Sequence, residues 1–264
     1  YSQLQHVTTI PLWRQYAFTN KEVDSLVESG LYEYASDPHL PSTGFLFCTP
    51  EASKTRRRVV HDCLLPNLLI EDGPVTTFRS MSWVRRLVVT HVYALAADFK
   101  QFYHQVEIAP AVRKFFPVLT AKGYIQPCHL PMGFKLAVPI AQRISLYIAS
   151  CTSSKNILTD VYIDNILWVA TTASEIHEVR RRFVSICAHF NVVIGDLQEG
   201  TSIVHRGLHL NFADRTVRLS DVFCAKFLQR WVWATNEKTK MRFGEFRSIL
   251  GSCVYASCSL GRPM

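Results

Sequence analysis

The sequence predicts an α+β fold in which helices cover one face of an antiparallel sheet. In residues 161–170, Asp164 and Asn165 stand between two runs of apolar, β-prone residues, a pattern typical of a hairpin with a carboxylate at its tip. A second apolar strand ends at Asp98. In residues 136–150, by contrast, the apolar side chains recur at helical spacing. Strands and helices are therefore mixed along the chain.

In the first part of the chain, the sequence predicts one helix and one basic hairpin. Thr19 and Glu22 have the spacing of a capping box, apolar residues follow at helical spacing, and Gly30 ends the helix. Residues 45–48 and 58–60 are expected to be strands around a loop, 49–57, of small and basic residues. Such a loop is able to close over a triphosphate, although an ordinary exposed hairpin would have the same composition.

The strand that carries Asp98 is predicted to span residues 88–99. Residues 106–108 and 115–119 are predicted to be further strands, with a turn at Gly123. The helix over residues 136–150 contains Pro139, which is tolerated in the first turns because the N–H group there has no helical partner.

The last third predicts two helices and two strands. Thr172 and Glu175 form a second capping box, and Ser220 caps the last helical region, which runs through Trp231 and Trp233. Strands are expected at 192–194 and 217–219. The apolar face of the first of these helices is predicted to consist of Ile176, Val179, Phe183, Ile186 and Phe190. The two tryptophans are expected to lie in a hydrophobic core rather than to stack on bases.

Composition allows a substantial hydrophobic core. The chain has 264 residues, 48% of them hydrophobic, which is enough for one large domain or for two or three subdomains. Its net charge is +8, and basic residues cluster at positions 56–58, 85–86, 113–114 and 180–182. A polyanionic partner would explain these clusters, and a solvated basic surface would do so equally well.

Cysteine usage favours a reducing environment. The eight cysteines include no Cys-x-x-Cys pair and no Cys–His cluster with zinc spacing, so we expect buried free thiols and an intracellular location, in the cytoplasm or nucleus. No run of 18 uncharged apolar residues occurs, so we expect no membrane span. Because the chain begins at Tyr1, we expect an excised domain of a longer protein.

Three motifs, in the same order, resemble those of retroelement reverse transcriptases. Residues 95–105 are similar to the first catalytic motif, 130–135 to the Leu-Pro-x-Gly loop, and 162–165 to the Tyr-x-Asp-Asp box. Weaker flanking matches extend the resemblance over nearly the whole chain: residues 30–33 and 56–67 are similar to fingers, 207–210 to the primer grip, and the segment from 219 onward to a thumb. The detailed pattern is similar to that of the tyrosine-recombinase retrotransposons of the DIRS or VIPER type.

The resemblance implies a right-hand polymerase fold with an antiparallel palm sheet. Its fingers would comprise residues 1–90, its palm 91–218 and the start of its thumb 219–264, with 110–130 shared between fingers and palm. The implied function is RNA-templated DNA polymerisation. The implied partners are a primed RNA or DNA template, deoxynucleoside triphosphates, and RNase H and other domains of a longer polyprotein.

The resemblance also implies a two-metal site. Two Mg²⁺ ions, with Mn²⁺ as the alternative, would bind Asp98, Asp164 and the backbone carbonyl of Phe99. Asn165 is expected in the catalytic group, but it departs from the family pattern, in which a second Asp is usual. Asn keeps an oxygen acceptor and loses the negative charge, so we expect weaker metal binding.

The remaining implied contacts are with nucleotide and primer. The residues expected at the nucleotide are Lys54, Arg57 or Arg58, Phe102, Tyr103, Met132 and Gly133. The residues expected at the primer are Tyr162, Gly207 and Leu208. Tyr103 matches the aromatic gate that excludes a ribose 2′-hydroxyl, and its alternative role is packing. Phe102 is bulkier than the small residue usual beside that gate.

Two other functions stay open. One is a decayed or repurposed copy that binds nucleic acid without polymerising, which Asn165 and Cys63 suggest, since a polar or basic residue is more usual at the position of Cys63. The other is an RNA-templated RNA polymerase, against which Tyr103 argues.

Overall fold

The computed structural model describes residues 19–36, 41–51, 56–234 and 243–261, which fall into two compact units. The first unit contains the described residues up to Thr76 together with Gln101–Ala141. The second unit contains Thr77–Lys100 and the described residues from Gln142 onward. The chain therefore passes between the units three times, and each unit is described by itself.

The first unit contains two small antiparallel sheets. One has the order β1 (Tyr32–Tyr34), β6 (Gly123–Pro127), β5 (Val118–Thr120), and the other is the hairpin of β2 (Phe45–Glu51) and β3 (Arg56–Asp62). Its helices are α2 (Asn20–Glu28), α3 (Leu64–Leu69), α5 (Pro110–Arg113) and the 3₁₀-helix η2 (Phe102–Gln105). A buried hydrophobic cluster joins α2 to strands of both sheets; it consists of Val23, Leu26, Tyr32, Leu46, Val118 and Ile125.

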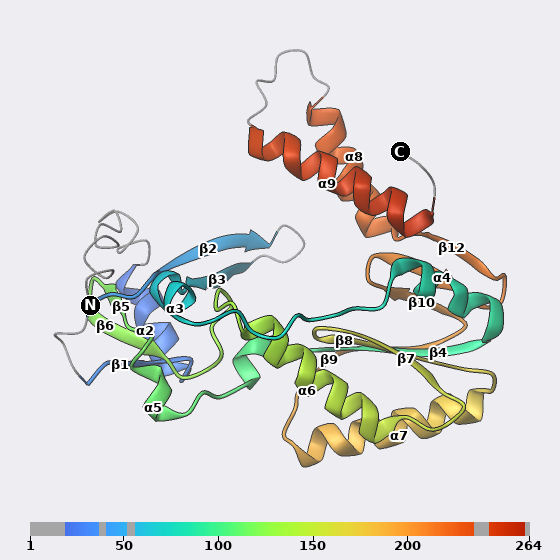
Figure 1. Cartoon of the computed structure of the whole chain (residues 1–264), viewed down its shortest axis with the longest axis horizontal. Helices are drawn as coiled ribbons and strands as arrows, with labels where there is room; N and C mark the ends of the chain where they lie inside the picture. Colours follow the sequence, from blue (N-terminus) through green and yellow to red (C-terminus); the bar gives the residue numbers. More distant parts are fainter. Residues whose placement is uncertain (1–18, 37–40, 52–55, 235–242, 262–264) are drawn as a thin grey trace. The chain divides into compact units, whose positions relative to one another are not determined.

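The second unit is built on a four-stranded antiparallel sheet of order β7-β8-β4-β9. These strands are β7 (Leu158–Tyr162), β8 (Asn165–Ala170), β4 (Tyr93–Phe99) and β9 (Ile194–Gly200). Helices α6 (Ala137–Thr152), which begins in the first unit, and α7 (Ala173–His189) cover one face (Figure 1). The buried indole of Trp168 on β8 donates to the hydroxyl of Thr152 on α6 at 3.0 Å and lies 5.0 Å from the ring of Phe183 on α7.

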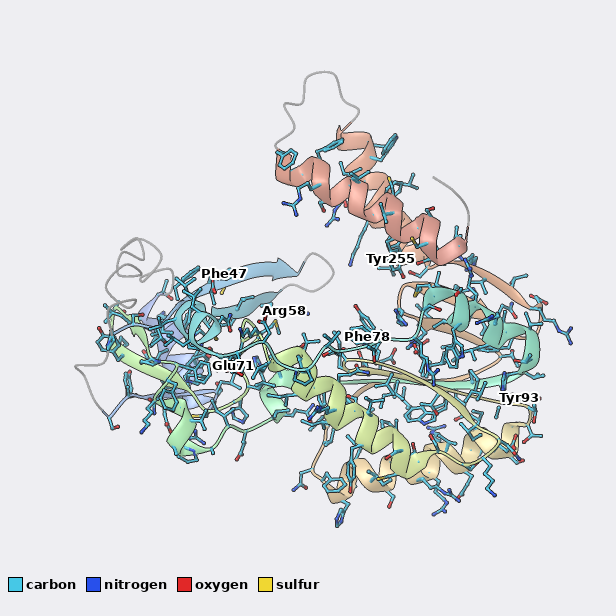
Figure 2. All side chains as sticks on the ribbon, viewed as in Figure 1. Phe47, Arg58, Glu71, Phe78, Tyr93 and Tyr255 are labelled. Carbon is cyan, nitrogen blue, oxygen red and sulfur yellow. The ribbon has the colours of Figure 1, made fainter. Side chains whose placement is uncertain are left out.

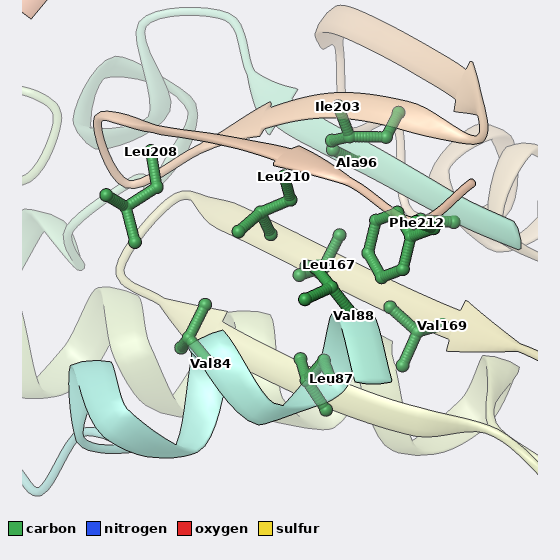
Figure 3. Close-up of a cluster of buried hydrophobic side chains, with 11 residues drawn as sticks. Val84, Leu87, Val88, Ala96, Leu167, Val169, Ile203, Leu208, Leu210 and Phe212 are labelled. Atoms are coloured by element: carbon green, nitrogen blue, oxygen red, sulfur yellow. The ribbon is translucent and has the colours of Figure 1, made fainter. Parts of the chain in front are cut away.

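The opposite face of this sheet is also covered. Helix α4 (Met81–Thr90) and the antiparallel sheet β10 (Ser202–His205), β11 (Leu208–Asn211), β12 (Thr216–Leu219) pack against it. Figure 3 shows the resulting core, which is composed of Val84, Leu87, Val88, Ala94, Ala96, Leu167, Val169, Ile203, Leu208, Leu210 and Phe212. The prediction that helices cover one face is therefore correct but incomplete, because the second face is buried as well.

Helices α8 (Asp221–Ala234) and α9 (Phe243–Leu260) complete the second unit. The guanidinium of Arg85 on α4 donates to the carbonyls of Cys258 and Ser259 at 3.4 and 3.2 Å, which places a cation at the C-terminal end of α9. Trp231, expected in a core, is 47% exposed, and the side chain of Trp233 lies outside the described residues. Among the helices described, none has the length and apolar character needed to cross a bilayer.

Most predicted elements are confirmed. Both capping boxes are present, at Thr19 and Thr172, the helix predicted over 136–150 is α6, and the hydroxyl of Ser220 accepts the N–H of Phe223 at the start of α8. The apolar face of α7 differs at its end: Cys187 is buried, whereas Phe190 is 49% exposed. The predicted strand at 192–194 is wrong in its limits, because β9 begins at Ile194 and continues to Gly200.

Four other expectations are wrong. Residues 88–90, predicted to begin the strand of Asp98, are instead the end of helix α4, which Ser80 caps. Strand β4 begins only at Tyr93. The prediction failed because a continuous apolar run does not distinguish a helix from a strand. Residues 106–108 form only an isolated bridge between Glu107 and His129, and β5 covers 118–120 rather than 115–119. The basic loop is shorter than predicted, since β2 and β3 pair as far as Glu51 and Arg56.

Candidate active site

The candidate site begins at the end of β4. This central strand is buried along most of its length and pairs with β8 on one side and β9 on the other, both antiparallel. The register places partly buried Asp98 opposite Asn165. The pattern of apolar residues thus holds the backbone rigid up to the position where the first carboxylate emerges.

The hairpin between β7 and β8 supplies the second carboxylate. Tyr162 pairs with Asn165, so Ile163 and Asp164 are the two turn residues, one position earlier than the predicted Asp-Asn tip. Ile163 has a φ of 56°, which is unfavourable for a β-branched residue. Its N–H donates to the side-chain oxygen of Gln142 at 2.6 Å, and the amide nitrogen of Gln142 donates to the carbonyl of Val161 at 3.0 Å. Buried Gln142 therefore holds the turn in a strained conformation.

Backbone and side-chain hydrogen bonds join the hairpin to β4. The N–H of Phe99 donates to the carbonyl of Asp164 at 3.2 Å, and the side-chain amide of Asn165 donates to Oδ1 of Asp164 at 2.9 Å. A second Asp at position 165 could not donate this bond. Asp98 and Asp164 are thus brought to the same end of one sheet.

On its other side, Asp98 lies against the backbone of β9. Oδ1 of Asp98 accepts the N–H of Asp196, and a β-carbon on Gly195 would collide with the same oxygen. The carboxylate of Asp196 accepts the N–H of Leu197 at 3.0 Å and the side-chain amide of Gln198 at 2.6 Å. Only glycine at position 195 leaves room for the Asp98 carboxylate where it stands.

The donor set fits Mg²⁺, with a small number of protein ligands. Asp98 and Asp164 present the oxygen ligands that this ion prefers, and Mg²⁺ is commonly bound by one or two carboxylates together with water and substrate phosphates. Among the residues the structure describes, no group of three or more His, Cys, Asp or Glu side chains could hold a metal ion. A metal bound here would therefore need ligands from backbone, from Asn165, from water or from a nucleotide.

The expected primer residues all belong to the second unit. The ring of Tyr162 lies 4.8 Å from that of Phe78, centroid to centroid. Gly207 has a φ of 74° in the turn between β10 and β11. The side chain of Leu208 is fully buried in the core, so any contact of Leu208 with a primer would have to use its backbone.

The expected nucleotide residues belong to the first unit. Phe102 is 3% exposed and Tyr103 is half-buried in η2, where the carbonyl of Tyr103 accepts the N–H of Val106. Arg58 is exposed on β3 opposite Thr49 (Figure 2). Arg57 lies on β3 opposite Pro50 but its side chain, like the whole of Lys54, falls outside the described residues.

Gly133 has a structural reason to be glycine. A β-carbon there would collide with the carbonyl of His61 on β3. Asn67 joins the two segments, since its side chain donates to the carbonyl of Gly133 at 2.8 Å and accepts the N–H of Lys135 at 2.8 Å. Met132 lines a small cavity of the first unit that His61 also lines.

Burial governs the titratable groups of this region. It lowers the pKa of His61 to about 3, so this side chain is neutral at physiological pH. It raises the pKa of Cys63, which is fully buried and keeps its thiol protonated. The position where a polar or basic residue was expected therefore belongs to the core of the first unit.

Arginines of several basic clusters form ion pairs with acidic residues of the same chain. Arg113 pairs with Glu33 at 2.8 Å, Arg180 pairs with Glu199 at 3.0 Å, and Arg181 and Arg182 share Glu178, each at 2.7 Å. Pairs as exposed as those on α7 contribute little to stability, because water screens their charges. Phosphates could therefore displace them at small cost, whereas the less exposed Arg113 is part of the fold.

Sequence reasoning missed Gln142 and Gly195. A signal existed for each of them. Gln142 interrupts the buried stripe of α6, and Gly195 stands inside a strand, where glycine often marks a close approach of another group.

This fold is similar to that of foamy viral protease-reverse transcriptases. One such structure, the dRH form in complex with double-stranded DNA, has a TM-score of 0.70 at 15% sequence identity and covers 89% of this chain and 39% of that chain. Another, in complex with an RNA/DNA hybrid, has a TM-score of 0.69 at 15% identity and covers 91% of this chain and 32% of that chain. The chain thus spans less than half the length of either. No protein-family model and no curated protein matches it. The likeness shows that the chain has a reverse transcriptase polymerase fold.

Replacing Gln142 by Ala should lower the free energy of unfolding by about 1–3 kcal/mol, because the N–H of Ile163 and the carbonyl of Val161 lose their partner. Denaturant unfolding measures this change. The matched control is Arg143→Ala on the exposed side of the same helix, which should shift stability by no more than about 0.5 kcal/mol. Equal effects of the two substitutions would contradict the bracing role of Gln142.

Proposed function

We propose that this chain is the polymerase domain of a reverse transcriptase, which extends a primer on an RNA template by two-metal nucleotidyl transfer. The observation that supports the proposal is the register of β4 against β8, in which Asp98 lies opposite Asn165. In the same register, the N–H of Phe99 donates a hydrogen bond to the carbonyl of Asp164. Two carboxylates at one end of a rigid sheet are the minimum that this chemistry requires.

Asp98 and Asp164 are the proposed ligands of two Mg²⁺ ions, or of Mn²⁺, with the carbonyl of Phe99 as a further ligand. When bound, such ions activate a 3′-hydroxyl as nucleophile and stabilise the pyrophosphate that leaves. Gly195 and the N–H of Asp196 fix the Asp98 carboxylate, and Gln142 fixes the turn that carries Asp164. Asn165 orients the Asp164 carboxylate by its hydrogen bond.

The proposed partners are a primed RNA or DNA template and deoxynucleoside triphosphates. Lys54 and Arg57 or Arg58 are assigned to the triphosphate, Phe102, Tyr103, Met132 and Gly133 to the nucleotide pocket, and Tyr162, Gly207 and Leu208 to the primer. The similar foamy viral structures are complexes with double-stranded DNA and with an RNA/DNA hybrid, which supports a nucleic-acid partner for this chain. An origin in a retrotransposon of the tyrosine-recombinase type, with RNase H and other domains in a longer polyprotein, is supported by the sequence pattern alone.

The eight free cysteines fit an intracellular, reducing compartment.

A second candidate is a domain that binds nucleic acid without polymerising. It is favoured by Asn165, which leaves only two acidic side chains in the proposed catalytic group.

A Mg²⁺ titration of primer extension on an RNA template separates the two functions. The wild-type protein should extend the primer. Asn165→Asp should extend it at lower Mg²⁺ concentrations, because a further negative charge near a divalent cation favours binding. Asp98→Asn and Asp164→Asn should each abolish extension, because each removes the negative charge of a direct ligand. The control is Asp214→Asn, an exposed carboxylate in the turn between β11 and β12, which should extend normally.

A folded wild type that is inactive at every Mg²⁺ concentration would exclude the leading function. If Asn165→Asp then restored extension, the second candidate would be supported. Normal extension by Asp164→Asn would exclude the assignment of the metal ligands.

Gly195→Ala should reduce the extension rate about 10- to 100-fold without unfolding the protein, because the new methyl group must displace the carboxylate of Asp98. Single-turnover extension kinetics measure the loss. Gly251→Ala is the matched control, since a β-carbon at that position in α9 meets no atom within 4 Å. Equal rates for both variants would refute the role of Gly195.

Tyr103→Ala should raise the incorporation of ribonucleotides relative to deoxyribonucleotides by about tenfold or more, if the ring excludes the 2′-hydroxyl. Competition between the two nucleotide types on one template gives this ratio. Tyr147→Ala, which removes an exposed ring from α6, serves as the control. Unchanged sugar selectivity in Tyr103→Ala would leave Tyr103 a packing residue.

A further inference from the structure

The turn between β10 and β11 has an unusual residue at its first position. Arg206 and Gly207 form a two-residue turn in which both φ angles are positive, 47° and 74°. Such turns favour Asn-Gly or Gly-Gly, because an arginine is strained in the left-handed region. A departure from a local rule is a reason to look at the contacts of the side chain, because proteins break such rules at functional sites.

The side chain of Arg206 makes three contacts with the region of the candidate site. Nη1 donates to Oδ2 of Asp160 on β7 at 3.4 Å and to the carbonyl of Arg79 at 2.9 Å. The guanidinium carbon lies 4.5 Å from the centre of the Tyr162 ring. Arginine is suited to these three contacts because its planar guanidinium can stack on a ring while its N–H groups donate at the edge.

Asp160 is a charged group in the interior of the unit. Its side chain is fully buried, and Oδ2 also accepts from Nε2 of His205 at 2.8 Å. Burial lowers the pKa of His205, and the hydrogen bond and charge of Asp160 only partly oppose this. His205 is thus neutral at physiological pH, and the positive charge that compensates Asp160 comes from Arg206.

The same turn is held from the side of α9. The hydroxyl of Tyr255, labelled in Figure 2, donates to the carbonyl of Arg206. A β-carbon on Gly207 would lie 2.9 Å from this hydroxyl, so the turn and the helix are in close contact. The backbone of Arg206 therefore meets α9 while its side chain meets β7.

We propose that Arg206 is a positioning residue, which locks the Arg206–Gly207 turn to the Tyr162–Asp164 hairpin through Asp160 and the ring of Tyr162. The lock keeps the end of the primer at a fixed place relative to the carboxylates of Asp98 and Asp164. This inference rests on the proposed function. Asp160 is its anchor, because it lies two residues before Tyr162 on the same face of β7.

The test compares Arg206→Gln, Arg206→Lys, Asp160→Asn and the double variant Asp160→Asn/Arg206→Gln. Arg206→Gln should lower kcat for primer extension about 10- to 100-fold with little change in the KM for nucleotide, since misplacement of reacting groups affects the chemical step. Arg206→Lys keeps the positive charge but lacks the planar group that stacks on Tyr162. Its kcat should therefore lie between those of the wild type and Arg206→Gln. The double variant should be no slower than Arg206→Gln, because both substitutions break the same lock.

The matched control is Arg215→Gln. Arg215 is an exposed arginine that also has a positive φ, 54°, in the turn between β11 and β12. Its substitution should leave kcat and KM unchanged. Wild-type kcat in folded Arg206→Gln, or effects of Asp160→Asn and Arg206→Gln that simply multiply, would overturn the proposal.

A second measurement does not depend on catalysis. A 2-aminopurine base at the primer terminus, bound at saturating protein concentration, should change its fluorescence in Arg206→Gln and keep it in Arg215→Gln. If the wild type binds primer–template without extending it, the proposed polymerase function fails, and this fluorescence alone decides the role of Arg206. Identical fluorescence in the wild type and Arg206→Gln would overturn that role, and a wild type that does not bind primer–template would overturn both proposals.

Discussion

The antiparallel register of β4 is the constraint on which the candidate site depends. Asp98 can lie beside the Asp164 turn only because Ala94–Asp98 pair residue by residue with Asn165–Val169. Successive side chains of a strand point to opposite faces, so a slip of one residue would turn Asp98 to the other face of the sheet. Burial on both faces prevents such a slip: α6 and α7 cover one side, and the core around Leu167 and Val169 occupies the other. Packing far from the carboxylates thus sets their positions.

Two turns with strained backbone lie at the end of this sheet, and a buried polar side chain holds each of them by hydrogen bonds. Ile163 is braced by Gln142 of α6, and Arg206 is tied to Asp160 of β7. Non-glycine residues in the left-handed region cost on the order of 1–3 kcal/mol each and persist only where neighbouring structure fixes them. Both turns lie next to residues assigned to metal or primer. Two strained turns and the buried polar side chains that hold them therefore lie beside the candidate site.

Local sequence rules predicted most elements because their signals are themselves local. The capping boxes at Thr19 and Thr172 are made by residues three apart, and the β7–β8 hairpin needs only its turn and two apolar runs. The same rules failed at residues 88–90, where an apolar run permits helix or strand and only packing of α4 decides. They also could not place Gly195 against Asp98, because that contact joins residues 97 positions apart and depends on which strand lies beside β4. Motif order indicated which residues carry the chemistry, while tertiary contacts determine what holds them.

Asn165 shows how a departure from a motif changes the balance of charge as well as the ligand set. Two adjacent carboxylates at the end of a sheet repel one another unless a cation lies between them. The side-chain amide of Asn165 instead donates to Asp164, so the hairpin is stabilised without a metal. On the proposed function, the protein alone would hold Mg²⁺ weakly, because the acidic ligands assigned to it are Asp98 and Asp164, and the described residues contain no group of three or more His, Cys, Asp or Glu side chains that could hold a metal. The phosphates of an incoming nucleotide would then complete the ligand set, and metal binding would be coupled to nucleotide binding.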